Sequence, residues 1–209
     1  MIWKDYIPID IQELYEVHDF KHAAAILVYE FPNEARELFS ALGEFRFTEE
    51  EVKSPGGNQS AIPKNFTSLL RNKGWVEDTL TAKMVVDDRT ISYDTHKVDY
   101  LKHRVAFDLE WNSKDQTFDR DLYAFRTFFE YDKISVGILV TRSNELDPWI
   151  SSLGEYKDRY GTTRHVKSKF GASTTHMGKL LPRLESGRNG GCPVLVFGIT
   201  TNLLEKGGN

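Results

Sequence analysis

Three acidic residues at short spacing are the strongest candidates for chemistry in this chain. Residues 105–111 alternate between large apolar side chains at the odd positions and Ala106, Asp108 and Glu110 at the even positions. On a β-strand, residues two apart point the same way, so Asp108 and Glu110 project side by side. Asp99 lies nine residues before Asp108. The three carboxylates can therefore converge on one point.

A cluster of acids is unfavourable unless a cation lies among them. Like charges within a few ångströms raise one another's pKa, and a positive ion reverses that effect. Carboxylate oxygens are the ligands that hard divalent cations prefer, so the cluster indicates a metal site, most simply for Mg²⁺. The alternative is a half-buried amphipathic strand whose outer face carries two acids without a functional role. Periodicity alone does not decide between the two.

Length and composition predict an ordinary globular chain. With 209 residues, of which 40% are hydrophobic, one sizeable core is expected, so we predict a single domain over residues 1–209. No apolar run approaches the roughly 18 residues of a membrane span, and the N-terminus lacks a secretory signal. The single cysteine, Cys192, excludes an internal disulfide and a cysteine metal cage. We expect a soluble, cytoplasmic protein without a membrane partner.

Charge is distributed unevenly along the chain. The net charge is −4, and residues 1–52 hold twelve Asp or Glu against four Lys or Arg. Residues 157–188 hold eight Lys or Arg against two acids. A basic segment on an acidic protein is typical of a face that binds a polyanion. A solvated surface is the simpler explanation of this segment taken alone.

Helical spacing of apolar residues predicts several helices around the acidic strand. They cover residues 22–29, 34–42, 62–72, 118–130, 145–153 and 175–185. Asn33 is the predicted N-cap of the second helix and Gly43 its end. Residues 11–20 fit a strand or a short helix. Residues 157–169 contain few apolar side chains, so we expect an exposed loop whose order depends on a partner.

The remaining segments predict strands of a mixed sheet. Residues 79–93 read as an antiparallel meander with a turn at Asp87-Asp88, leading into the acidic strand. The runs 134–141 and 193–200 are nearly continuously apolar, as in strands buried on both faces. A strand, a helix and a strand in succession form a parallel pair. The predicted fold class is therefore α/β (α+β), with a central mixed β-sheet flanked by helices.

The acidic strand looks like the metal-binding core of the PD-(D/E)xK nucleases. Within that superfamily the chain resembles the type II restriction endonucleases of the BglII/BstYI type in blocks that occur in the same order. The blocks, spread over about residues 56–200, are Gly74-Trp75, Ser92-Tyr93, Asp99 with Arg104-Val105-Ala106, Tyr131-Asp132-Lys133-Ile134 with Val136-Gly137, and Gly187-Arg188 before residues 193–199. Two motif positions depart from the pattern. The last, commonly lysine in the superfamily and glutamine in the most similar enzymes, is Glu110, as in the acidic variant of BamHI, and the middle one, often Glu, is Asp108.

The resemblance implies a restriction-endonuclease-like fold and an activity. It implies Mg²⁺-dependent hydrolysis of phosphodiester bonds in double-stranded DNA at a short palindromic site, leaving 5′-phosphate ends. Asp99 and Asp108, with the Leu109 carbonyl, would hold the metal, and Glu110 would orient or deprotonate the attacking water. Asp94 is a further candidate acid.

The resemblance also implies partners. Enzymes of this type are homodimers that read palindromes, and they belong to restriction-modification systems, so a DNA methyltransferase is expected in the same system but not as a stable partner. A loop of small polar residues that opens a helix suits phosphate binding. The candidate DNA contacts are Asn58, Gln59, Ser60, Arg164, Lys167, Lys169 and Arg188. A repair or recombination nuclease of the same fold, a catalytically inactive DNA-binding protein, and a protein unrelated to DNA remain alternatives.

Overall fold

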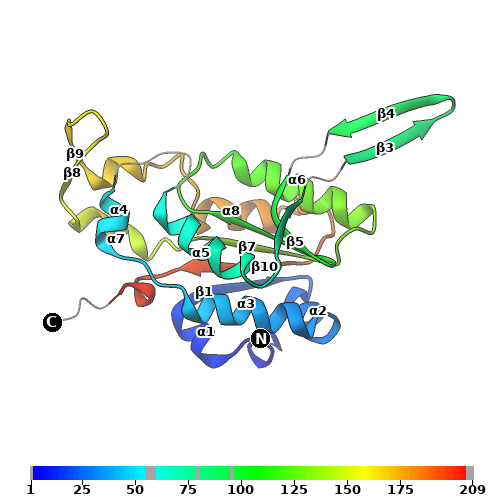
Figure 1. Cartoon of the computed structure of the whole chain (residues 1–209), viewed down its shortest axis with the longest axis horizontal. Helices are drawn as coiled ribbons and strands as arrows, with labels where there is room; N and C mark the ends of the chain where they lie inside the picture. Colours follow the sequence, from blue (N-terminus) through cyan, green and yellow to red (C-terminus); the bar gives the residue numbers. More distant parts are fainter. Residues whose placement is uncertain (1, 55–59, 79–80, 95–96, 206–209) are drawn as a thin grey trace.

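The fold is built on a six-stranded mixed sheet with helices on both faces (Figure 1). The computed structural model describes residues 2–54, 60–78, 81–94 and 97–205. The strand order is β1-β10-β7-β6-β5-β2. These strands are β1 (Tyr15–Phe20), β2 (Val76–Asp78), β5 (Val98–Lys102), β6 (Val105–Glu110), β7 (Val136–Arg142) and β10 (Val194–Ile199). The predicted α/β arrangement of a mixed sheet between helices is confirmed.

Three parallel strands form the centre of the sheet. β7 pairs in parallel with β6 on one side and with β10 on the other, and every residue of these three strands is buried. Helix α6 (Thr117–Glu130) connects β6 to β7, which confirms the predicted strand, helix and strand unit. β1, β5 and β2 complete the sheet as antiparallel strands.

The two faces of β6 belong to two hydrophobic cores. Its odd positions, such as Phe107, pack with the helices of one face, and Ala106 packs with the helices of the other. The first face carries α1 (Ile9–Leu14), α2 (Ala23–Glu30), α3 (Pro32–Glu44), α4 (Glu49–Lys53), α5 (Ala61–Arg71) and α7 (Leu146–Ser152), and the second carries α6 and α8 (Met177–Glu185). Because Asp108 and Glu110 share the even positions with Ala106, they point toward the α6 side.

Close packing fixes the helices next to the acidic strand. On one face, the ring of Phe66 in α5 stacks on Phe107 of β6, with centroids 5.4 Å apart and planes 9° from parallel. On the other face, α6 lies so close to β7 that a Cβ atom at Gly137 would come within 2.4 Å of the Phe125 ring. Glycine at this position therefore permits the approach of α6, and with it the position of the first turn of that helix.

Most predicted helices are confirmed within a few residues, and α3 differs from the prediction at both of its ends. Residues 11–20, left undecided, contain both α1 and β1. Helix α3 begins at Pro32 with Phe31 as its N-cap, so the prediction of Asn33 as the cap is wrong. Proline at the first helical position has no N–H to satisfy and a suitable φ, which explains the earlier start. Gly43 lies inside the helix, which ends at Glu44.

Two other expectations need correction. β3 (Thr81–Val86) and β4 (Arg89–Asp94) confirm the expected antiparallel pair with its turn at Asp87-Asp88. They form a separate two-stranded sheet that projects from the body of the molecule, so the predicted meander does not continue into β5 (Figure 1). Residues 157–169, expected to be a loop, contain a short hairpin and a 3₁₀ turn. The elements are β8 (Glu155–Lys157), β9 (Thr163–His165) and η2 (Val166–Lys169). Val166 and Phe170 are buried, which anchors this segment to the core.

Two further 3₁₀ turns lie near the ends of the chain, η1 (Ile2–Asp5) and η3 (Thr201–Leu203). Within the described parts of the chain, no helix combines the length and the apolar character that crossing a membrane requires.

Candidate active site

Asp99 and Asp108 lie on neighbouring antiparallel strands, and each carboxylate accepts a backbone N–H of the other strand. The register of β5 and β6 pairs Tyr100 with Phe107, and its continuation puts Asp99 opposite Asp108. The Asp99 amide donates to Asp108 Oδ1 at 2.6 Å, and the Leu109 amide donates to Asp99 Oδ2 at 3.1 Å. Strand pairing thus fixes both carboxylates, because each replaces a carbonyl as the acceptor of a main-chain N–H at the end of the ladder.

The two acids of β6 are buried. Asp108 is 2% exposed and Glu110 is 6% exposed, whereas Asp99 is accessible to solvent. This result contradicts the alternative of a half-buried strand with two solvated acids. One oxygen of the buried pair, Asp108 Oδ2, has no hydrogen-bond partner among the described residues. A buried carboxylate oxygen without a partner is unfavourable and indicates a missing proton or cation.

Helix α6 adds two residues that the sequence analysis did not identify. Asp121 is 1% exposed, and its Oδ2 also has no partner in the described structure. Arg120 Nε and Nη2 lie 3.2 and 3.1 Å from Asp121 Oδ1, and Nη2 lies 3.6 Å from Glu110 Oε1. The sequence did contain a signal for Asp121. It stands three residues after Phe118 and four before Phe125, on the apolar face of the helix.

Surrounding protein atoms and the charges of neighbouring carboxylates raise the pKa of all four acids. For Asp108, burial is the main cause, followed by the charges of Asp121, Asp99 and Glu110, and the pKa lies well above its usual value. Burial likewise raises the pKa of Glu110 to about 7, although a Ser113 hydrogen bond and the Arg120 charge oppose the shift.

The same causes act on the other two acids of the cluster. The pKa of Asp121 is raised well above its usual value by burial and by Glu110, against Arg120. Protein atoms crowded around the Asp99 carboxyl and the charge of Glu77 raise its pKa, while the Leu109 N–H and Arg120 lower it. The cluster therefore favours protons or a cation.

A groove of about 880 Å³ lies beside the acidic cluster. Asp99, Leu109 and Glu110 line it on the strand side, and α5 supplies Lys64, Thr67, Ser68 and Arg71. Arg71 Nε donates to Tyr100 Oη at 2.9 Å, with the guanidinium 5.6 Å from the Tyr100 ring. Lys64 and Arg71 were not predicted, because α5 was interpreted only through its apolar face. Their spacing of seven residues, two helical turns, was the available signal.

The predicted DNA contacts that the structure describes divide into two groups. Ser60 and Lys169 line the groove, although the Lys169 ammonium donates to the carbonyls of Val52, at 2.7 Å, and Ser54. Away from the described groove lining, each of the other three basic candidates is in an ion pair: Arg164 with Asp158, Lys167 with Asp147 and Arg188 with Asp119. Asn58 and Gln59 lie outside the described residues, as does the side chain of Asp94.

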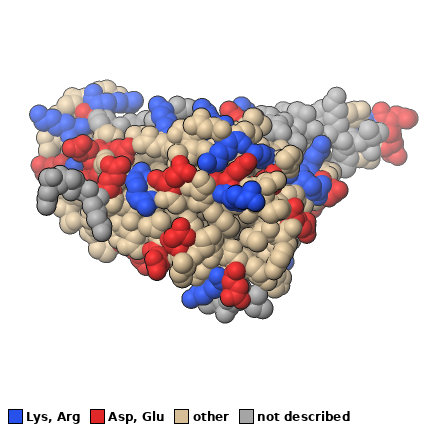
Figure 2. All heavy atoms as spheres, turned by 60° about the horizontal axis from the view of Figure 1, so that its bottom comes forward, with Lys and Arg blue, Asp and Glu red and all other residues tan. Residues whose placement is uncertain are grey.

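Surface charge by itself does not identify a binding face. On the side seen in Figure 2, the described lysines and arginines are interspersed with aspartates and glutamates. The assignment of a site therefore depends on the groove and its buried acids.

The carboxylate oxygens of the acidic cluster suit a hard divalent cation. In the described part of the chain, no three His, Cys, Asp or Glu side chains are arranged as a ready ligand set for a metal ion. The two carboxylate oxygens without partners, Asp108 Oδ2 and Asp121 Oδ2, are nevertheless of the chemical type that Mg²⁺ and Ca²⁺ prefer.

Comparison with known proteins identifies the family. No curated protein sequence matches the chain. The family model described as restriction endonuclease BglII/BglIII matches residues 15–199. This range contains the whole six-stranded sheet, the four acids and the groove. The chain therefore belongs to the BglII/BglIII family of type II restriction endonucleases, enzymes that hydrolyse double-stranded DNA at specific sites.

Proposed function

We propose that this restriction endonuclease depends on Mg²⁺ and hydrolyses one phosphodiester bond in each strand of a short palindromic site, leaving 5′-phosphate and 3′-hydroxyl ends. The observation that carries the proposal is Asp108, a carboxylate 2% exposed with one oxygen unpartnered, beside Glu110 at the groove. A buried carboxylate without a partner requires a compensating charge. Restriction endonucleases of this family generally use divalent metal ions.

Asp99, Asp108 and the Leu109 carbonyl are the groups that we assign to the metal. Asp99 and Asp108 come from two paired strands, and their carboxylates bond to backbone amides of each other's strand, so both are held in place before any ligand arrives. A divalent cation bound there would lower the pKa of a coordinated water and neutralise charge on the scissile phosphate.

Glu110 is assigned to the attacking water. It lies two residues from Asp108 on the same side of β6 and lines the groove. In the reaction the water oxygen bonds to phosphorus while the bond from phosphorus to the 3′ oxygen breaks. Glu110 orients the water and accepts its proton, and the departing 3′ oxygen takes a proton from solvent.

The DNA backbone is proposed to follow the wall of the groove that α5 forms. Lys64 is exposed there, and Arg71 is already oriented by Tyr100. Phosphate contacts of this kind give affinity without reading sequence. Ser60 and Lys169, which line the groove, remain candidates, and so do Asn58 and Gln59, which lie outside the described residues. Arg164, Lys167 and Arg188 would have to exchange their present carboxylate partners for phosphates.

A palindromic site implies a two-fold dimer. One active site per chain cuts one strand, so cutting both strands at symmetric positions requires two copies of this chain. A DNA methyltransferase that protects the same site in the host is the expected companion of the system.

Digestion of a long unmethylated DNA in Mg²⁺ tests the proposal. We expect discrete fragments with 5′-phosphate ends from the wild type and from the control Asp10→Ala, an exposed acid of α1. Asp108→Ala and Glu110→Ala should bind DNA but not cut it. In thermal unfolding, Mg²⁺ should stabilise the wild type and not Asp108→Ala. Wild-type turnover by either variant would overturn the site assignment, and a smear of fragments would overturn the palindromic site.

A further inference from the structure

In the part of the chain that the structure describes, one positive charge pairs with the acidic cluster, and it comes from helix α6. The motif position that is commonly lysine in the superfamily is Glu110 here, so β6 itself provides no cation. Among the described residues, Arg120 is the only Lys or Arg in an ion pair with any of the four acids, through Glu110 and Asp121. Its charge also acts on Asp99 and Asp108.

One part of the Arg120 guanidinium is bonded to Asp121, and the rest is exposed. Its Nε and Nη2 both contact Asp121 Oδ1, and Asp121 is fixed because it is 1% exposed within the packed face of α6. The Arg120 side chain is 47% exposed, and its Nη1 has no hydrogen-bond partner among the described residues. Arg120 is not among the residues that line the groove, but Glu110 is, and Arg120 Nη2 lies 3.6 Å from Glu110 Oε1. An anion that reaches Glu110 can therefore meet free N–H donors of an oriented guanidinium.

The chemistry of the reaction needs such a group. Negative charge accumulates on the phosphoryl oxygens as water attacks, and four carboxylates nearby would repel it. A guanidinium stays charged at every pH of interest, and its planar fork matches two phosphate oxygens. Donors that are already oriented lower the energy of such a charge more than mobile ones.

We propose that Arg120 is a catalytic residue that contacts the scissile phosphate and provides, from α6, the positive charge that β6 lacks, and that Asp121 positions it. The inference rests on the proposed function. A positioning role for Asp121 explains why an acid is buried on the apolar face of α6, where an aliphatic side chain would pack more favourably.

Single-turnover cleavage by Arg120 variants tests the proposal, with Arg126→Ala as the matched control. Arg126 lies on the same helix in an exposed pair with Glu130, so its removal changes the net charge equally. We expect Arg120→Ala to lose about 100-fold in rate and Arg120→Lys to lose less, since lysine keeps the charge without the fork. Arg126→Ala should stay within about twofold of the wild type. DNA affinity without metal and the melting temperature are measured for each variant.

Two further measurements separate a catalytic role from a structural one. Free guanidinium should restore part of the rate of Arg120→Ala and none of the rate of Asp108→Ala. If Asp121 acts through Arg120, the rate losses of Asp121→Asn and Arg120→Ala should not add in the double variant.

The outcomes against the proposal are distinct from those against the function. A wild type that cuts DNA beside an Arg120→Ala variant within about threefold of it would overturn the role of Arg120 and leave the proposed function intact. A loss of rate matched by an equal loss of DNA affinity, without rescue by guanidinium, would also overturn it. A wild type that does not cut in Mg²⁺ would overturn the proposed function itself.

Discussion

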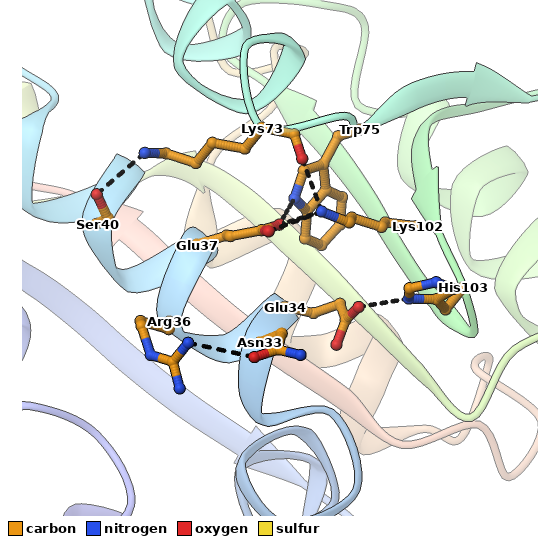
Figure 3. Close-up of polar contacts among 9 residues, drawn as sticks. All are labelled: Asn33, Glu34, Arg36, Glu37, Ser40, Lys73, Trp75, Lys102 and His103. Carbon is orange, nitrogen blue, oxygen red and sulfur yellow. Dashed lines mark hydrogen bonds and ion pairs between the residues drawn. The ribbon is translucent and has the colours of Figure 1, made fainter.

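Acidic side chains have opposite surroundings at the two ends of the β5–β6 hairpin: donors at the turn, and other acids at the far end. At the turn, residues of the hairpin meet two acids of α3 (Figure 3). Lys102 Nζ lies 2.7 Å from both oxygens of Glu37, which also accepts from Trp75 Nε1 at 2.9 Å. Glu34, 4% exposed, pairs with His103 Nδ1. Each of these carboxylates has a donor from the hairpin or the segment before it.

At the other end of the same hairpin, the acids face one another. Asp108 and Asp121 each keep an oxygen without a partner. The pKa values at the two ends are shifted in opposite directions. Burial alone would raise the pKa of Glu34, but the His103 hydrogen bond and the Lys102 charge bring it below its usual value. Burial and neighbouring acids raise the pKa of Asp108. Partners, more than burial, decide whether a buried acid stabilises the fold, and the unpaired end is the one available to a ligand.

The largest expected difference between the two ends is in catalysis. Asp108→Asn should slow single-turnover cleavage by about 10³-fold or more, because the neutral amide cannot hold the metal. Glu37→Gln, at the paired end, should leave the rate per folded molecule within about threefold. An equal loss in Glu37→Gln, measured at a temperature where circular dichroism shows it folded, would contradict the division of roles.

The next difference is in stability. Glu37→Ala should lower the free energy of unfolding by about 2–4 kcal/mol, because the Lys102 ammonium and the Trp75 N–H both lose an acceptor in a partly buried place. Urea titration measures this. Glu130→Ala, which removes the exposed partner of Arg126, should change the same quantity by less than about 0.5 kcal/mol. Equal effects of the two substitutions would show that the turn is not specially stabilised.

At the unpaired end, neutralising an acid should raise the free energy of unfolding instead of lowering it, and only above acidic pH. The pKa of Glu110 is about 7 in the folded chain, compared with 4.5 when unperturbed. The Glu110 carboxyl therefore costs no stability below pH 4.5, and it lowers the free energy of unfolding progressively as pH rises toward 7. Glu110→Gln should therefore be more stable than the wild type by about 1–3 kcal/mol at pH 8 without metal. The difference should vanish near pH 4. A constant difference across this range would contradict the assignment of the shift to the carboxyl.

The sequence predicted the elements of this site better than their mutual orientation. Alternation in residues 105–111 was sufficient to put Asp108 and Glu110 on one face of a strand, and the apolar run after α6 was sufficient for the parallel pair. Such periodicities are local. The pairing of Asp99 with Asp108 depends on a tight turn in which His103 adopts a φ of 49°, and this was not visible in the pattern.

Features that depend on tertiary packing were missed. Asp121 was not identified, because an acid in the first turns of a helix already has a local explanation as a charge that suits the helix dipole. Its burial follows from the rotation of α6 about its axis, which Phe125 and Gly137 fix. In the same way, the basic segment looked free in the sequence, whereas Arg164 and Lys167 have carboxylate partners that only the folded chain brings close.

The smallest expected effect also has the opposite dependence on pH, which sharpens the comparison. The pKa of Glu34 in the folded chain is below its usual value. The ionised carboxylate therefore adds to the free energy of unfolding above pH 4.5, and this stabilisation is lost as pH falls through the folded pKa. Glu34→Gln should therefore be less stable than the wild type by about 1 kcal/mol at pH 7. The two proteins should converge in acid, measured by urea titrations at several pH values. Glu110→Gln should also converge with the wild type in acid, but from the more stable side. If both substitutions moved stability in the same direction at pH 7, the distinction between a paired and an unpaired end of the hairpin would fail.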